Sequence, residues 1–144
     1  MPSVTASVDL DCSAERAWSL LADVRRVPEW VPGVADASVL ETDAAGRAVR
    51  VRFVGMPAAG SLVYVLRYRY DDAARTLRWL TDVGDDRSIE GEARISERPG
   101  GCRLDYVLST WSARSLPTWA QATLADDTPQ RTARAFKRWV EQLP

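Results

Sequence analysis

The side chains able to do chemistry in this sequence are tyrosines, tryptophans, arginines, carboxylates and two cysteines, because histidine is absent. Without histidine there is no Ser/His or Cys/His nucleophile pair, no histidine zinc ligand and no ordinary general base near neutral pH. The cysteines, Cys12 and Cys102, form no CxxC motif and indicate neither a zinc site nor a disulfide scaffold. We expect no metal and no cofactor.

The most informative spacing is an alternation of tyrosines with arginines between Ser61 and Asp71. In a strand, successive side chains point to opposite faces, so Tyr64 and Tyr68 share one face while Arg67 lies on the other. Burying unpaired arginines is costly, which assigns the tyrosine face to the interior. The same argument places further residues inside: Val49, Val51, Phe53, Leu77, Trp79, Thr81, Leu104, Tyr106, Leu108 and Thr110.

The elements that must position these side chains begin with a strand and two short helices. Residues 4–10 alternate between apolar and polar, as in a half-buried strand. Ser13 can cap a helix whose apolar positions include Trp18 and Leu21, and Pro28 ends that helix or separates it from a short second one.

Residues 34–112 then read as about six antiparallel strands separated by turn residues. A C-terminal helix is predicted to begin near Thr118 and to kink or restart at Thr128. In its last part, apolar residues fall at helical spacing and must face the sheet: Phe136, Trp139, Val140 and Leu143. This order predicts one α+β domain, a curved antiparallel sheet around a helix, over residues 1–144.

Composition excludes several partners. The net charge is -1, and 18 of the 19 basic residues are arginines scattered among acidic neighbours, so we expect no nucleic-acid partner. The first residues lack the pattern of a secretory signal, and no stretch is long and apolar enough for a membrane span. We therefore expect a cytoplasmic protein.

The stretch Ala17–Asp23 followed by Val27–Val34 (VPEWVPGV) resembles the opening of START-like (SRPBCC) proteins of the polyketide cyclase/dehydrase and lipid-transport group. The resemblance in element order spans essentially the whole chain. It implies a helix-grip fold of seven curved antiparallel strands around a long C-terminal helix, supported by the two short helices and enclosing a deep cavity. Functions in the group include ligand carriage, aromatase/cyclase chemistry and co-chaperone activity, so the fold does not determine the function.

In a fold of this kind, the tyrosine face is expected to line the cavity and contact the ligand. Antiparallel hairpins alternate ends, so residues 55–60, 83–87 and 113–117 should meet at one end, the predicted cavity mouth. Aromatic side chains with a hydroxyl or indole N–H suit an apolar ligand that a few polar groups orient. The predicted ligand-binding residues are Trp30, Phe53, Met56, Tyr64, Leu66, Tyr68, Trp79, Thr81, Tyr106, Leu108 and Trp119.

Three functions remain open, and carriage of a small hydrophobic or aromatic ligand is favoured. An aromatase/cyclase or dehydratase acting through tyrosine hydroxyls would need an acid or base in the cavity, and strand parity points the nearby carboxylates outward: Asp82, Glu90, Glu92 and Asp105. A partner-binding, co-chaperone-like module ranks last, because the outward positions are charged. No catalytic residue is assigned.

Further properties stay open at this point. Polyketide, lipid, quinone and steroid ligands all remain possible, and so do a monomer and a weak homodimer. Cys12 ends the first strand and Cys102 opens the last, which should run as neighbours, so a redox pair is a hypothesis.

Overall fold

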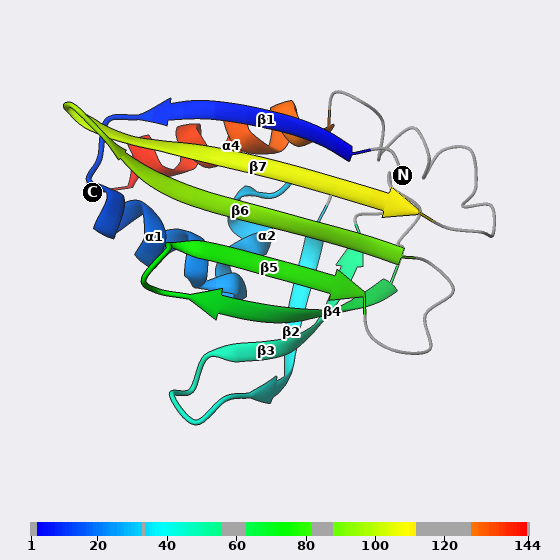
Figure 1. Cartoon of the computed structure of the whole chain (residues 1–144). Coiled ribbons are helices and arrows are strands. Elements are labelled where there is room, and N and C mark those ends of the chain that lie inside the picture. Colours follow the sequence, from blue (N-terminus) through cyan, green and yellow to red (C-terminus); the bar gives the residue numbers. More distant parts are fainter. Residues whose placement is uncertain (1–2, 33, 56–62, 82–87, 112–127, 144) are drawn as a thin grey trace.

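The computed structural model describes residues 3–32, 34–55, 63–81, 88–111 and 128–143. Its seven strands form one sheet in the order β1-β7-β6-β5-β4-β3-β2, in which every neighbouring pair is antiparallel. The sheet curls along its length (Figure 1). The strands are β1 (Ser3–Leu10), β2 (Val34–Thr42), β3 (Ala48–Gly55), β4 (Val63–Asp71), β5 (Thr76–Thr81), β6 (Ser88–Arg98) and β7 (Gly101–Trp111).

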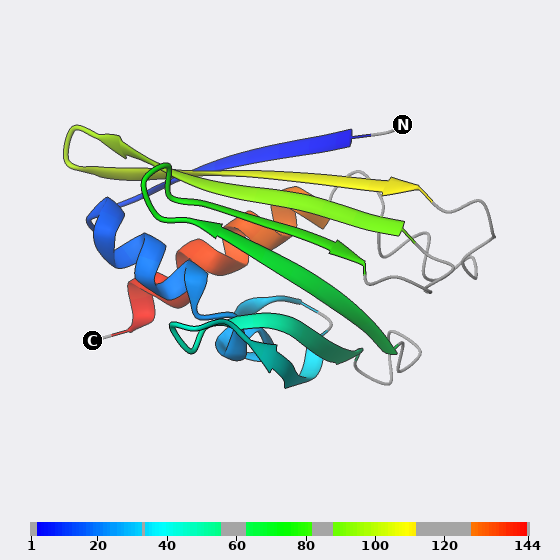
Figure 2. The same ribbon diagram turned by 60° about the horizontal axis from the view of Figure 1, so that its bottom comes forward.

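The described helical segments are α1 (Ala14–Ala22), a 3-10 turn η1 (Val24–Arg26), α2 (Val27–Trp30) and α4 (Thr128–Gln142). The Ser13 hydroxyl accepts a hydrogen bond of 3.1 Å from the Arg16 N–H and caps α1 as expected. Pro28 lies in the first turn of α2 and needs no N–H there. Figure 2 shows these helices on one side of the sheet, which curves around them. The predicted helix-grip fold is confirmed.

Strand parity divides the sheet as the sequence indicated. Tyr68 and Trp79 are buried on the face toward the helices, whereas Arg67 and Arg78 are exposed on the other face. One detail of the prediction is wrong: Val49 is only half-buried, and its neighbour Ala48 belongs to the core instead. The register between β2 and β3 shifts near this hairpin, so alternation breaks there.

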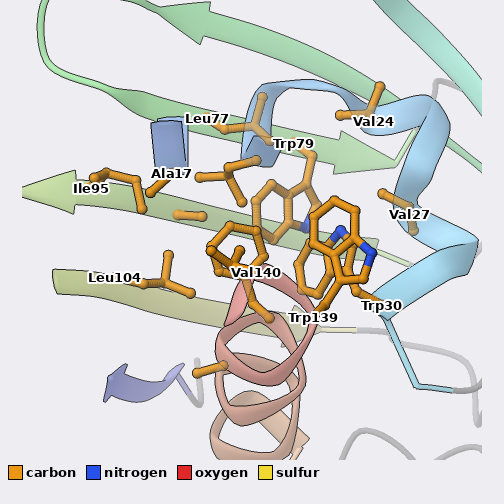
Figure 3. Packing of buried hydrophobic residues seen from close by; sticks show 14 of the residues in the cluster. Ala17, Val24, Val27, Trp30, Leu77, Trp79, Ile95, Leu104, Trp139 and Val140 are labelled. Carbon is orange, nitrogen blue, oxygen red and sulfur yellow. The ribbon is translucent and has the colours of Figure 1, made fainter. Parts of the chain in front are cut away.

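The apolar stripe of α4 packs under the sheet as predicted. Phe136 is fully buried, and Trp139 and Val140 are buried beside it. Trp30 of α2 meets both aromatic rings, with its centroid 4.9 Å from that of Phe136 and 6.2 Å from that of Trp139. Figure 3 shows Trp30, Trp139 and Val140 together in this core. Trp30 therefore packs α2 against α4.

The antiparallel order fixes which strand ends lie together. Gly55, Val63, Thr81 and Ser88 border the same end of the sheet, and β7 also finishes at this end. The three segments predicted to form the mouth join these ends but lie outside the described residues, so the mouth stays a prediction. No described helix is both long and apolar enough to cross a membrane.

Candidate functional site

Five aromatic side chains form a continuous series across the inner face of the sheet. Ring centroids are 5.6 Å apart for Phe53 and Tyr64, and 6.3 Å apart for Phe53 and Tyr68. The series continues from Tyr68 to Trp79 at 6.2 Å and from Trp79 to Tyr106 at 5.4 Å. All are tilted or edge-on contacts, the arrangements that aromatic rings prefer. We call these five residues the aromatic wall.

The aromatic wall crosses β6 only because that strand has a glycine there. Trp79 of β5 pairs in register with Gly91 of β6, which in turn pairs with Leu108 of β7. A Cβ atom at position 91 would fall inside the Trp79 indole. The ring therefore lies directly against the β6 backbone and reaches Tyr106 on the strand beyond.

The wall carries three hydrogen-bonding groups without a partner among the described residues. The Tyr68 and Tyr106 hydroxyls and the Trp79 indole N–H make no hydrogen bond to any residue within the described ranges. Tyr68 and Trp79 are each only 8% exposed, yet no described side chain has a fully enclosed polar atom without a partner, so these groups keep some accessible surface. By contrast, the Tyr70 hydroxyl donates to the Ala48 carbonyl, as a structural tyrosine does.

Burial keeps the wall hydroxyls protonated. Desolvation raises the pKa of Tyr68 well above its usual value and also raises that of Tyr106, and the neighbouring tyrosines add to both shifts. Neutral phenols donate hydrogen bonds and do not act as bases near neutral pH. The wall thus offers donors in an apolar, uncharged setting.

These shifts predict loss of stability in alkali. Burial raises the pKa of Tyr70 and of Cys102 to about 12, from 10.0 and 9.0. Between the unfolded and folded pKa values the native state holds protons that the unfolded chain releases, so stability falls as pH rises from about 9 toward 12. Melting temperature measured from pH 7 to 11 should drop in this window and drop less in Tyr68→Phe. An unchanged melting temperature up to pH 11 would contradict the assignment.

Carboxylates stay off the inner face, as parity predicted, wherever the structure describes them. Glu92 makes a 2.8 Å ion pair with Arg78 on the outer face. Asp105 accepts a 2.6 Å hydrogen bond from the exposed Ser7 hydroxyl, and Glu90 is exposed. Asp82 lies outside the described residues. Within the described part of the chain, no cluster of three or more potential metal ligands is present.

The remaining predicted residues fall into three groups. Leu66 and Thr81 are buried on the inner face beside the wall, and Leu108 is buried at the register position next to Gly91. Trp30 packs into the helix core described above. Met56 and Trp119 lie outside the described residues. Sequence reasoning missed Gly91; a glycine inside a strand, opposite a tryptophan on the next, was the available signal.

A curved antiparallel sheet gripping a long helix, with an aromatic inner face, defines the helix-grip class of protein. The family model for polyketide cyclase/dehydrase and lipid transport matches residues 1–143. The chain therefore belongs to this family.

Solved structures agree on the fold. A START superfamily protein from Mycobacterium smegmatis is 23% identical, with a TM-score of 0.81 and 99% of both chains covered. The Zhui aromatase/cyclase from Streptomyces sp. R1128 is 18% identical, with a TM-score of 0.76, covering 98% of this chain and 94% of that one. The di-domain ARO/CYC protein BexL from the BE-7585A biosynthetic pathway is 19% identical, with a TM-score of 0.75, covering 98% and 47%. No curated protein matches the sequence.

Proposed function

We propose that this protein binds and carries a small, neutral, apolar or aromatic ligand inside the helix grip, against the aromatic wall. The observation that carries the proposal is the set of three polar groups, on Tyr68, Trp79 and Tyr106, that make no hydrogen bond within the described ranges and keep some accessible surface. Polar groups in such an apolar and largely buried setting usually have a hydrogen-bond partner from the protein, water or a ligand. A ligand with one or two acceptor oxygens would accept hydrogen bonds from these groups.

The chemistry of the wall indicates which ligands fit. Flat aromatic side chains contribute apolar contact area, and the polar groups described on this face are an indole N–H, neutral phenols and the Thr81 hydroxyl. The described arginines of the strands point to the outer face, so none of them is a buried cation that could pair with a carboxylate or phosphate. Neutral ligands bearing carbonyl or ether oxygens therefore fit better than anionic ones.

The direct test is equilibrium binding of N-phenyl-1-naphthylamine, a neutral apolar fluorophore, followed by displacement with candidate ligands. We expect saturable binding at one site per chain and a rise in melting temperature with ligand concentration. Non-saturable binding, or binding without any thermal stabilisation of the native state, would contradict the proposal.

Removing the wall hydroxyls separates their role in binding from their role in folding. Tyr68→Phe and Tyr106→Phe should each change the free energy of unfolding by less than about 1 kcal/mol, because neither hydroxyl has a hydrogen bond to lose among the residues that the structure describes. Binding of a carbonyl-bearing ligand should weaken about 3- to 10-fold, while binding of a matched hydrocarbon should not change. Tyr70→Phe, which loses a protein hydrogen bond, is the control that should affect stability but not binding.

A second function, aromatase/cyclase or dehydratase chemistry on a poly-keto substrate, is favoured by the same hydroxyls. Two of the similar structures carry such activities in their names. Neutral phenols could polarise a ketone or stabilise an enolate, although no described carboxylate is placed to remove a proton. Incubation with a poly-keto analogue distinguishes the two: new cyclised product that disappears in Tyr68→Phe/Tyr106→Phe supports catalysis, and recovery of unchanged analogue supports carriage.

The proposal extends to organisation and location. We infer one ligand-binding domain over residues 1–144, acting in the cytoplasm as a monomer or weak homodimer without a nucleic-acid partner. Support comes from the family match over residues 1–143 and the net charge of -1. A co-chaperone-like role is less favoured because charged side chains occupy much of the outer sheet face. Size-exclusion chromatography with light scattering tests the oligomeric state.

A further inference from the structure

The two cysteines meet at the end of the sheet opposite the strand ends that border the predicted mouth. Cys102, the second residue of β7, pairs in register with Leu10, the last residue of β1. Cys12 follows two residues later, where the chain turns into α1. Both cysteines are free thiols, Cys102 is 1% exposed, and Cys12 is half-buried against the same core. Burial raises the pKa of Cys102 and the neighbouring Cys12 thiol adds to the rise, which indicates that the two side chains lie close together.

The backbone around the pair is shaped for this close approach. Gly101 lies so tightly against the Leu10 carbonyl that a Cβ atom there would collide with the oxygen. A residue with a side chain would push β7 away from β1 and separate the sulfurs. Nearby, Arg75 adopts a positive φ of 48°, which is unusual for a residue other than glycine, and its charge lies close enough to act on Cys102.

We propose that Cys12 and Cys102 form a redox-active dithiol that small-molecule disulfides convert to an internal disulfide. The half-buried Cys12 reacts first: its thiolate attacks one sulfur of the oxidant, forming a mixed disulfide and releasing one thiolate. Cys102 then gives up its proton to solvent and attacks the sulfur of Cys12, releasing the second thiol. Two protein thiols are oxidised while one small-molecule disulfide is reduced to two thiols.

Order of reaction follows from the surroundings of each sulfur. Burial and the neighbouring Cys12 raise the pKa of Cys102 to about 12, and the Arg75 charge opposes this only in part. Cys102 therefore stays protonated and hidden from an oxidant until a mixed disulfide forms beside it. This makes Cys12 the attacking residue and Cys102 the resolving one.

The bond would connect the turn before α1 to the start of β7 without reaching the aromatic wall. Closing a loop between residues this far apart in sequence restricts the unfolded chain strongly. We expect oxidation to raise the melting temperature by about 10 °C. Ligand affinity of the oxidised protein should stay within about twofold of that of the reduced protein, because the disulfide lies at the other end of the strands from the predicted mouth.

The test is incubation of the native full chain with glutathione disulfide, followed by intact mass measurement after blocking free thiols. The wild type should lose two hydrogens, carry no glutathione, and return to the starting mass with reductant. Cys102→Ser should retain one glutathione on Cys12, and Cys12→Ser should react slowly or not at all. Recovery of two free thiols in the wild type, or a lasting glutathione adduct on Cys12 without ring closure, would overturn the proposal. A disulfide that leaves the melting temperature unchanged would overturn its stabilising role.

Discussion

Replacing Phe136 with alanine is expected to lower the free energy of unfolding by about 3–5 kcal/mol, the largest single-residue loss we predict. Phe136 is fully buried on α4, and its ring contacts Trp30 of α2 at 4.9 Å and Trp139 at 5.9 Å between centroids. Truncation removes apolar burial and leaves a cavity that these rigid rings cannot collapse to fill. Urea denaturation monitored by circular dichroism measures the change.

A matched control lies two residues away on the same helix. Arg134 is exposed, so Arg134→Ala should change the free energy of unfolding by no more than about 0.5 kcal/mol. If Phe136→Ala costs less than about 1 kcal/mol, or no more than Arg134→Ala, the packing of α4 against α2 described here is wrong.

Gly91→Ala is expected to weaken binding of a neutral aromatic ligand about tenfold or more, although position 91 need not touch the ligand. A methyl group there collides with the Trp79 indole, which must lift away from β6. Displacing the ring moves it toward the interior of the grip and narrows the space over the aromatic wall. Dissociation constants for a size series of probes should show the largest ligands losing most affinity.

The double variant decides whether the effect passes through Trp79. In a Trp79→Leu background the flexible leucine can give way, so adding Gly91→Ala should change affinity by less than about threefold. An equal loss in both backgrounds would show that Gly91 acts through the backbone instead. Thermal melts of all four proteins separate loss of binding from loss of folding.

Much of the fold was predictable because its signals are local. The alternation of Tyr64 and Tyr68 with Arg67 determines which face of β4 is inside. The opposite orientation would bury arginines, which is costly even when they are hydrogen-bonded. The Ser13 cap, the apolar stripe around Phe136 and the turn glycines each determine the structure of only a few neighbouring residues, so they can be recognised in the sequence. The prediction for Val49 was wrong because the register between β2 and β3 shifts in this hairpin. Such a shift depends on how two strands pair, and the alternation within one strand carries no information about it.

The site was predictable as a list of side chains but not as an arrangement. Parity indicated that Trp79 and Tyr106 share a face, yet their contact across β6 depends on Gly91, which is set by register. Trp30 was predicted to contact a ligand, whereas its packing against Phe136 and Trp139 depends on the tertiary structure. The placement of Cys12 and Cys102 at neighbouring strand ends, by contrast, followed from the strand order that the family resemblance implies, and the structure pairs Cys102 with Leu10, two residues before Cys12.

The most direct test of the central claim is the indole N–H resonance of Trp79 in a proton–nitrogen NMR titration with a neutral aromatic ligand. Trp79→Phe identifies the signal, and the Trp18 indole, which donates a 3.0 Å hydrogen bond to Asp72 at the surface, is the internal control. We predict a saturable shift of Trp79 at one ligand per chain, with Trp18 unchanged. A Trp79 signal that stays fixed while the ligand binds elsewhere, or does not bind at all, would contradict a ligand site on the aromatic wall.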